Sequence, residues 1–359
     1  MTYSKPLLII GNGARNVGDW SKFGFPIQTT RLGIDLIESD NPLFSGRFGL
    51  FTDIPSYLVV KNADLIMTVG ARLDPGFVGY NFKDFAPQAD IRIVDIDPKE
   101  LDKFEYEGSR VKVVSMLAKD YFKSFNKIAR TGGCKDWLDQ IHEWQKKYPL
   151  KLTGSYKVIR EISDQATKDD VIVVDTSSSF HTAAQIWQIK KGQRYITTGG
   201  ISTMGYWPAS IGASLASGRR VICITGDGCL QMNIQELATV VKNKLNIKIF
   251  VLNNDGYLLI RHTQKKYFGR VMGESPKTGL GFPDLQDIAK AYGIRYENEN
   301  KMKWSAETKW VDETIADTVA RVLKGKDPVL CEIKTPRWEK SQGRLDDLSK
   351  SALLTTQTY

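Results

Sequence analysis

The chain alternates between short runs, most of them continuously apolar, and segments with helical spacing. Apolar positions at helical spacing extend, for example, from Asn233 to Lys242. Runs that are apolar throughout are typical of parallel strands covered on both faces. Strands that alternate with helices predict an α/β fold of two doubly wound parallel-sheet domains. The runs that we interpret as strands are Leu7–Ile10, Leu65–Val69, Ile91–Ile96, Val171–Val174, Val221–Ile224, Ile247–Leu252 and Val329–Ile333.

A break in this pattern separates the two predicted domains. Residues 131–133 are Thr-Gly-Gly, and a polar helix is expected over Lys135–Lys147. The pair Tyr148-Pro149 ends it, because proline disfavours the helical conformation in the residue before it. We therefore expect a first domain over residues 1–130, a linker helix within 131–154, a second domain over 155–335 and a C-terminal tail over 336–359.

Composition narrows the class of protein. A length of 359 residues suits two domains, and no run of about 18 apolar residues predicts a membrane span. Residues 1–5 lead directly into a strand, so we expect no signal peptide. The net charge of +9 is dispersed in pairs, so nucleic acid is not an expected partner. Four cysteines without CxxC spacing argue against zinc and fit a reducing, cytoplasmic location.

The most informative stretch is a βαβ unit with polar residues after both strands. The run from Val221 ends in Gly226-Asp227-Gly228, and the run from Ile247 ends in Asn253-Asn254-Asp255-Gly256. In open α/β sheets, ligands bind at the carboxyl ends of the strands. Asp227 offers a carboxylate oxygen, Asn254 an amide oxygen and Gly256 a backbone carbonyl. These hard oxygen donors suit Mg²⁺ bridging to a diphosphate.

The glycines and the following helix support the same interpretation. Gly226 and Gly228 allow the backbone to approach phosphates closely, and backbone N–H groups at a helix start favour an anion. Twenty-four residues separate Gly-Asp-Gly from Asn-Asn. With this spacing the segment resembles the signature of thiamine-diphosphate enzymes. The stretch from Gly226 to Thr239 is similar to the acetolactate synthase group of that family nearly residue by residue.

Two further stretches extend the resemblance. In the glycine-rich segment 198–213, Ser202 is expected to contact the cofactor. Met204 stands where the family has the bulky residue that holds the cofactor bent, a positioning that lowers the reaction barrier. After Val171–Val174 comes Asp175-Thr-Ser-Ser-Ser-Phe-His181, where the family places diphosphate contacts. The family commonly has Gly-Gln-His where this chain has Ser177, Ser178 and Ser179. A catalytic role and a structural role both remain open for His181.

The segment after Asn254 implies the substrate pocket. By resemblance, Leu259 and Ile260 face the thiazolium ring and the substrate, and His262 and Gln264 are candidates for the pocket. The acetolactate synthase group has tryptophan where Thr263 stands, so the pocket differs at this position. The resemblance implies catalytic roles for Met204, Leu259 and His262. The expected cofactor contacts are Ser177, Ser178, Ser179, Ser202, Met204, Gly226, Asp227, Gly228, Cys229, Asn254, Gly256, Tyr257, Leu258 and Leu259.

The first domain resembles the family's middle domain through Gly11-Asn-Gly13, Gly70-Ala-Arg72-Leu-Asp and Asp95-Ile-Asp-Pro. Some members bind FAD there, so FAD remains possible, with Gly70 and Arg72 as contacts. A purely scaffolding domain is the alternative. Gly11-x-Gly13 alone is a weak dinucleotide signal, because it lacks the third glycine and the later acidic residue.

The resemblance covers residues 5–335 and includes no pyrimidine-binding domain, which in this family supplies the activating glutamate. We therefore expect a separate pyrimidine-domain subunit in a hetero-oligomer, as a dimer or tetramer of such units; a truncated product is the alternative. The expected function is that of an acetolactate synthase-like carboligase or lyase subunit, which decarboxylates a 2-oxo acid such as pyruvate and transfers the two-carbon unit to an acceptor carbonyl. A 2-oxo acid decarboxylase, a nucleotide-cofactor oxidoreductase and a non-catalytic partner subunit are the alternatives.

Overall fold

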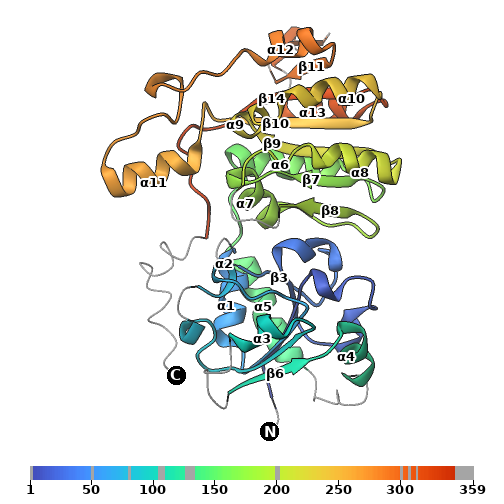
Figure 1. Cartoon of the computed structure of the whole chain (residues 1–359), viewed down its shortest axis with the longest axis vertical. Coiled ribbons are helices and arrows are strands. Elements are labelled where there is room, and N and C mark those ends of the chain that lie inside the picture. The colour runs from blue at the N-terminus through green and yellow to red at the C-terminus, as the bar shows by residue number, and fades with distance from the viewer. Residues whose placement is uncertain are drawn as a thin grey trace. The chain divides into compact units, whose positions relative to one another are not determined.

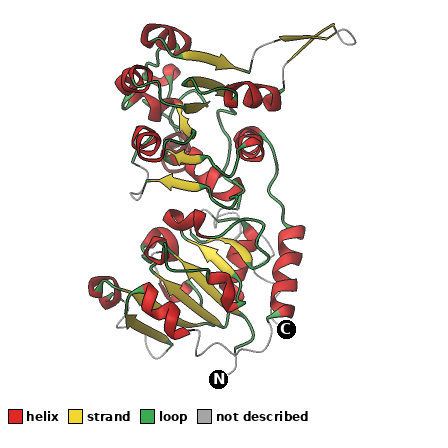
Figure 2. Ribbon diagram, turned by 90° about the vertical axis from the view of Figure 1, so that its right-hand side faces the viewer, coloured by secondary structure: helices red, strands yellow, loops and turns green. Residues whose placement is uncertain are grey.

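The computed structural model describes residues 3–49, 52–79, 82–103, 110–125, 134–198, 203–299, 302–305, 309–312 and 314–343. The chain forms two compact units. The first unit has two segments, one that ends at Leu150 and one that begins at Gln342. The second unit spans Lys151–Ser341. Each unit is built on a six-stranded parallel sheet with helices on both faces (Figure 1, Figure 2). The predicted class of two doubly wound α/β domains is confirmed.

The sheet of the first unit has the order β3-β2-β1-β4-β5-β6, and the direction of winding reverses between β1 and β4. Its strands are β1 (Pro6–Ile10), β2 (Ile27–Thr29), β3 (Phe44–Arg47), β4 (Leu65–Val69), β5 (Asp90–Asp95) and β6 (Val111–Ser115). Its α-helices are α1 (Ile54–Asn62), α2 (Pro75–Val78), α3 (Pro98–Asp102), α4 (Ala118–Phe125) and α5 (Lys135–Lys147). Its 3₁₀ helices are η1 (Asn12–Ala14), η2 (Trp20–Phe23), η3 (Arg31–Leu36) and η4 (Phe82–Asp84).

Helix α5, which the sequence places in the linker, packs on the first unit. Trp137, Ile141 and Trp144 are buried in the core of this unit. The indole of Trp137 also donates a hydrogen bond to the carbonyl of Pro6 at 3.1 Å. Apolar residues at helical spacing therefore attach α5 to the first sheet.

The sheet of the second unit has the order β11-β14-β10-β9-β7-β8. Its strands are β7 (Val171–Val174), β8 (Arg194–Thr197), β9 (Val221–Gly226), β10 (Ile247–Asn253), β11 (Arg295–Asn298) and β14 (Val329–Lys334), with a separate antiparallel pair β12 (Met302–Ser305) and β13 (Lys309–Asp312). Its α-helices are α6 (Gly154–Gln165), α7 (Ser177–Ile186), α8 (Ala209–Ser217), α9 (Asp227–Gln231), α10 (Leu237–Lys242), α11 (Leu258–Phe268), α12 (Leu285–Tyr292) and α13 (Ile315–Leu323). Its 3₁₀ helices are η5 (Ile234–Glu236) and η6 (Pro276–Thr278).

The helix after β9 differs from the prediction. The sequence pattern places its start near Asn233, whereas α9 already begins at Asp227 and a break separates it from α10. Asn233 lies at this break with φ −141°, and its side-chain amide donates to the carbonyl of Gly205 at 2.7 Å. The break between α9 and α10 therefore coincides with a hydrogen bond from Asn233 to the loop that contains Gly205. None of the helices in the described ranges has the length and apolar composition needed to cross a membrane.

Candidate functional site

Three loops meet at the carboxyl edge of the second sheet. They follow β7, β9 and β10, and β9 lies between the other two strands. The winding direction reverses between β7 and β9, and open α/β sheets bind their ligands at such a switch point. Asp227, after β9, is 5% exposed, and Asn254, after β10, is 6% exposed. The sheet therefore brings two of the predicted metal ligands to one buried edge; α9 and α11 lie at this side of the unit (Figure 1).

The Asp227 carboxylate is held by backbone amides. Oδ1 accepts from the N–H of Gly228 and Oδ2 from the N–H of Gly256, both at 2.8 Å. Burial raises its pKa to about 6, although these two hydrogen bonds and the charge of Arg261 act in the opposite direction. Burial also raises the pKa of the neighbouring Cys229 thiol, so this side chain is a buried neutral group at neutral pH.

Asn254 presents an acceptor that nothing in the described part of the chain satisfies. Its Oδ1 is buried and has no hydrogen-bond partner there. A buried unpaired polar atom costs about 1–3 kcal/mol, so native sites that contain one call for an explanation. The turn that follows is unusual as well, with φ of +63° at Asp255 and +128° at Gly256. A non-glycine residue in the left-handed region is a strained conformation that concentrates at functional sites.

Glycines allow two close approaches around this turn. A Cβ on Gly228 would lie 2.2 Å from the ring of Tyr257, so this ring lies against the Gly-Asp-Gly backbone. A Cβ on Gly256 would lie 1.8 Å from the carbonyl oxygen of Glu274. Gly226 has more room, because a Cβ on this residue would lie 3.8 Å from the hydroxyl of Ser179. The spacing of glycines in the motif thus reflects packing as well as access for a ligand.

Asp175, after β7, connects the glycine-rich segment to the sheet. Its carboxylate accepts from the backbone N–H groups of Tyr206 at 3.0 Å and Trp207 at 3.1 Å. It also accepts from the N–H of Thr176 at 2.8 Å and from the hydroxyl of Thr225 at 3.0 Å. Asp175 is fully buried, and these four donors compensate for the loss of hydration.

The segment around Met204 is therefore anchored just beyond this residue. Met204 is half-buried and precedes Gly205, whose φ is +87°. The carbonyl of Gly205 accepts from Asn233, which links the segment to the start of η5. Ser202, the other predicted contact in this stretch, lies outside the described residues.

The three serines begin helix α7. Ser177 has φ +67°, a second left-handed non-glycine residue at the same sheet edge. Ser177 and Ser178 are half-buried, and Ser179 is 2% exposed with its hydroxyl near Gly226. His181 lies one helical turn further on, is 3% exposed, and packs edge-on against the ring of Phe180.

Helix α11 carries the predicted substrate-side residues. Leu258 is buried, Leu259 is half-buried and Ile260 is 42% exposed. The His262 Nε2 is 2.9 Å from the carbonyl oxygen of Glu339, and its ring packs edge-on against Trp338. The Gln264 side chain bonds to both the N–H and the carbonyl of Met272, at 2.9 and 3.1 Å. The structure thus directs His262 and Gln264 towards neighbouring backbone within the unit.

The donors after β9 and β10 fit a magnesium ion. No three His, Cys, Asp or Glu side chains come together as metal ligands in the described ranges. The set here is instead the Asp227 carboxylate, the Asn254 amide oxygen, which has no partner among the residues that the structure describes, and the Gly256 backbone carbonyl. Mg²⁺ prefers oxygen ligands and commonly binds through one or two carboxylates, with phosphate and water oxygens in the rest of the octahedron. A coordinated ion would satisfy the buried Asn254 Oδ1.

The predicted FAD contacts in the first unit have other partners. A Cβ on Gly70 would lie 2.5 Å from the Gly13 carbonyl carbon, so these glycines let the loops after β1 and β4 pack together. The Arg72 guanidinium pairs with Glu100 at 2.8 Å. Glu100 lines the same edge groove as Asp95 and Asp97, and acidic groups disfavour a dinucleotide diphosphate. Neither the geometry nor the family matches below support FAD.

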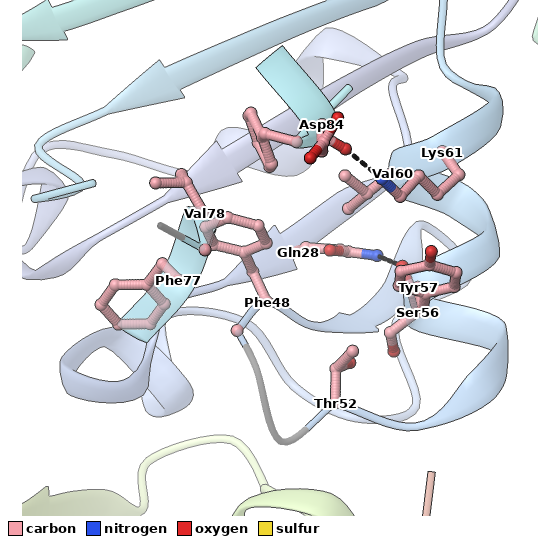
Figure 3. Close-up of a pocket in the computed structure, with 13 residues that line it drawn as sticks. Gln28, Phe48, Thr52, Ser56, Tyr57, Val60, Lys61, Phe77, Val78 and Asp84 are labelled. Carbon is pink, nitrogen blue, oxygen red and sulfur yellow. Dashed lines mark hydrogen bonds between the residues drawn. The ribbon is translucent and has the colours of Figure 1, made fainter. Parts of the chain in front are cut away.

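The first unit also contains a cavity of about 280 Å³ between β2, α1 and the α2–η4 segment. Figure 3 shows the stacked rings of Phe48 and Phe77 on one side and α1 on the other, with Gln28 between them. The Gln28 amide donates to the carbonyl of Ser56 at 2.8 Å, and the Lys61 ammonium to the carbonyl of Asp84. None of its lining residues belongs to the site predicted from the sequence.

Sequence reasoning missed three residues that shape the site: Asp175, Arg261 and Glu274. Asp175 follows a strand just as Asp227 does, so the rule of carboxyl ends could have assigned it a role. Arg261 stands one helical turn from the buried Leu258, a periodicity that places it on the inner face of α11. Glu274 lies in an irregular segment, where periodicity carries no signal.

Two family models match the chain. "Thiamine pyrophosphate enzyme, central domain" matches residues 2–117, and "Thiamine pyrophosphate enzyme, C-terminal TPP binding domain" matches residues 175–333, so together they cover most of the chain. The first match contains all six strands of the first sheet, and the second begins just after β7 and contains the whole βαβ unit around Asp227 and Asn254.

Curated relatives give a consistent picture. The chain is 33% identical over 310 residues to an acetolactate synthase large subunit of Cyanidium caldarium, covering 81% of this chain and 52% of that protein. It is 30% identical over 300 residues to the acetolactate synthase isozyme 2 large subunit of Escherichia coli (strain K12), with coverages of 81% and 54%. For acetolactate synthase 1, chloroplastic, of Zea mays, the identity is 27% over 363 residues, with coverages of 93% and 54%. The chain spans about half the length of the curated relatives it matches.

Proposed function

This chain belongs to the thiamine pyrophosphate enzyme family, and from that premise we propose that its second unit binds the diphosphate of thiamine diphosphate through Mg²⁺. The protein ligands of the ion are the Asp227 carboxylate, the Asn254 amide oxygen and the Gly256 carbonyl. The observation that carries this assignment is the buried Asn254 Oδ1, which lacks a partner in the described residues beside a carboxylate. A divalent cation provides that partner and also favours the ionised form of Asp227.

The surrounding residues complete the cofactor contacts. Ser177, Ser178 and Ser179 offer hydroxyl and backbone donors at the switch point between β7 and β9. Gly226, Gly228, Cys229 and Tyr257 line the edge on the β9 side, where Tyr257 lies against Gly228. Met204 would support the bound cofactor, and Asp175 would act through the segment that carries Met204.

We further propose that the chain takes part in an acetolactate synthase-like reaction, the decarboxylation of a 2-oxo acid such as pyruvate with transfer of the two-carbon unit to an acceptor carbonyl. The family membership and the acetolactate synthase relatives support it. When bound, thiamine diphosphate supplies the electron sink for decarboxylation. The residues of this chain orient it: the metal ligands fix the diphosphate, and Met204, Leu258 and Leu259 exclude water from its reactive face.

The pyrimidine-binding domain is outside the two family matches. The proposed active species therefore combines this chain with such a domain, carried by another subunit or another segment, in a dimer or tetramer. Leu259 and His262 contribute to the substrate side, where Thr263 replaces a tryptophan of the acetolactate synthase group and leaves the acceptor open. A reducing, cytoplasmic setting is proposed because all four cysteines are buried without a disulfide.

The test is a calorimetric titration of the full chain with thiamine diphosphate, with and without Mg²⁺, beside an Asp227→Ala variant. Binding that requires Mg²⁺ and disappears in the variant is expected. A protein that contains the pyrimidine-binding domain is then added to the calorimeter cell. It should raise the affinity for thiamine diphosphate if it completes the site. Absence of Mg²⁺-dependent binding even with that protein present would exclude the proposed cofactor site. Release of carbon dioxide from pyruvate by the completed species would then test the reaction.

A further inference from the structure

Arg261 is a fully buried charge directly behind the proposed metal-binding turn. Its side chain is 0% exposed, and so is that of its ion-pair partner Glu274. Arginine and glutamate are almost never completely buried unless they are paired, because removing a charge from water costs several kcal/mol per ion. A buried pair is weak evidence for stability, since apolar residues of similar volume often stabilise as well. We therefore look for the role of the Arg261–Glu274 pair in the hydrogen bonds that it makes to the turn.

The guanidinium of Arg261 holds the turn from within. It donates to the carbonyl of Asn254 at 3.2 Å and to the carbonyl of Asp255 at 2.7 Å. It also donates to the carbonyl of Arg337 and to the Glu274 carboxylate. Helix α11 thus folds one of its own side chains back onto the turn that begins it. The rigid fork of donors on arginine suits this, whereas lysine offers a single charged centre.

Glu274 holds the same turn from the other side. Its backbone carbonyl accepts the N–H of Tyr257 at 2.8 Å and contacts Gly256 so closely that no Cβ would fit. Its carboxylate accepts from the Ser275 hydroxyl at 2.8 Å and from Arg337 at 3.0 Å, in addition to Arg261. The left-handed backbone of Asp255 and Gly256 is therefore fixed by contacts from two separate segments.

We propose that Arg261 and Glu274 are positioning residues for the metal site, which hold Asn254 and Gly256 with their oxygens in the arrangement that a divalent cation requires. The identity of the ligand, Mg²⁺ with thiamine diphosphate, rests on the proposed function. The restraint of the turn rests on the hydrogen bonds alone. Groups that orient metal ligands typically contribute 10- to 100-fold in metal affinity.

The experiment replaces the pair by apolar residues of similar size, Arg261→Met with Glu274→Leu, in the full chain. Two quantities are measured: the Mg²⁺ concentration that half-saturates thiamine diphosphate binding, and amide hydrogen exchange of residues 254–258 in the metal-free protein. The double variant should fold, need roughly tenfold more Mg²⁺ and exchange faster in the turn. Arg261→Lys, which retains the charge without the fork of donors, should also require more Mg²⁺ than wild type and exchange faster in the turn.

A matched control is the Arg220–Asp170 pair, which lies just before β9 and β7 at the opposite, amino end of the same sheet. Arg220 binds Asp170 through two contacts of 2.7 Å. Arg220→Met with Asp170→Leu should leave both readouts of the turn unchanged. An Arg261/Glu274 double variant with wild-type Mg²⁺ requirement and wild-type exchange would overturn the inference. If wild-type binding does not depend on Mg²⁺, the proposed function fails, while the exchange measurement still decides whether the pair restrains the turn.

Discussion

The Asp227 Oδ2 accepts a hydrogen bond from the N–H of Gly256 at 2.8 Å, across a sequence separation of 29 residues. This contact joins the loop after β9 to the turn after β10. It therefore holds the Asp227 carboxylate next to the turn that carries the Asn254 side chain, before any ion binds. A site organised in this way loses little conformational freedom when the ion binds. The predictions below separate residues that organise this edge from residues that contact the ligand.

Asn254→Ala should weaken Mg²⁺-dependent binding of thiamine diphosphate by at least tenfold while leaving the free energy of unfolding within about 1 kcal/mol of wild type. The reason is that the lost amide oxygen has no partner in the described residues, so removing it breaks no protein hydrogen bond. Calorimetry and urea denaturation of the ligand-free chain measure the two effects. A clear loss of stability with unchanged affinity would show that Asn254 supports the fold instead.

Gly228→Ala should destabilise the second unit by about 1–3 kcal/mol, because the new methyl group would lie 2.2 Å from the ring of Tyr257. Tyr257→Ala removes that ring, so the double variant should be more stable than the sum of the single effects implies. Unfolding of the four proteins in urea gives the coupling energy. Strictly additive effects would contradict the proposed contact as the source of the strain.

Asp175→Asn should cost about 2–4 kcal/mol and also weaken cofactor binding. Its carboxylate accepts from the N–H groups of Tyr206 and Trp207 and from the hydroxyl of Thr225. In asparagine the NH₂ group replaces one of the two accepting oxygens, so at least one of these hydrogen bonds is lost. Displacement of the segment that carries Met204 then reduces the affinity for thiamine diphosphate. Urea denaturation and calorimetry measure the two effects. Wild-type stability together with wild-type binding would remove Asp175 from the set of organising residues.

The strongly apolar strands could be read from the sequence, whereas several others could not. Five of the six residues in the run Ile247–Leu252 are apolar, a composition that indicates a covered parallel strand, and the run lies within the buried β10. By contrast, β6 (Val111–Ser115) is largely exposed and mixes lysine with valine, and β3 (Phe44–Arg47) contains glycine. Pairing with neighbouring strands determines these segments, and local pattern does not reveal such pairing.

The candidate site divides in a similar way. Asp227 and Asn254 follow two strands that the sequence predicts, so their meeting at one edge follows from sheet geometry. The contact between Arg261 and Glu274 depends on how an irregular segment returns to the turn, and no periodic pattern encodes it. The edge-on contact of the half-buried His262 with Trp338 likewise depends on the path of the chain after β14. Tertiary contacts of this kind require the three-dimensional structure.

Lys248 places an ammonium group within the buried part of the second sheet. This residue of β10 is 0% exposed, and its Nζ donates to the carbonyl of Asp327. Burial, reinforced by the nearby charges of Arg220 and Arg295, lowers its pKa to about 8, while Asp327 acts in the opposite direction. In the unfolded chain the pKa is near its usual 10.5. Between these values the unfolded state binds more protons than the folded state.

The free energy of unfolding should therefore rise as pH increases from about 8 towards 10, because the folded chain then no longer carries a buried charge. Each unit of the lowered pKa corresponds to about 1.4 kcal/mol of stability lost below pH 8. Lys248→Met should remove this cost, so it should be more stable than wild type at pH 7, with a difference that shrinks towards pH 10. Urea denaturation of both proteins at several pH values isolates Lys248 from other groups that titrate. A difference that stays constant with pH would show that the pKa of Lys248 is the same in the folded and unfolded chains and would contradict the prediction.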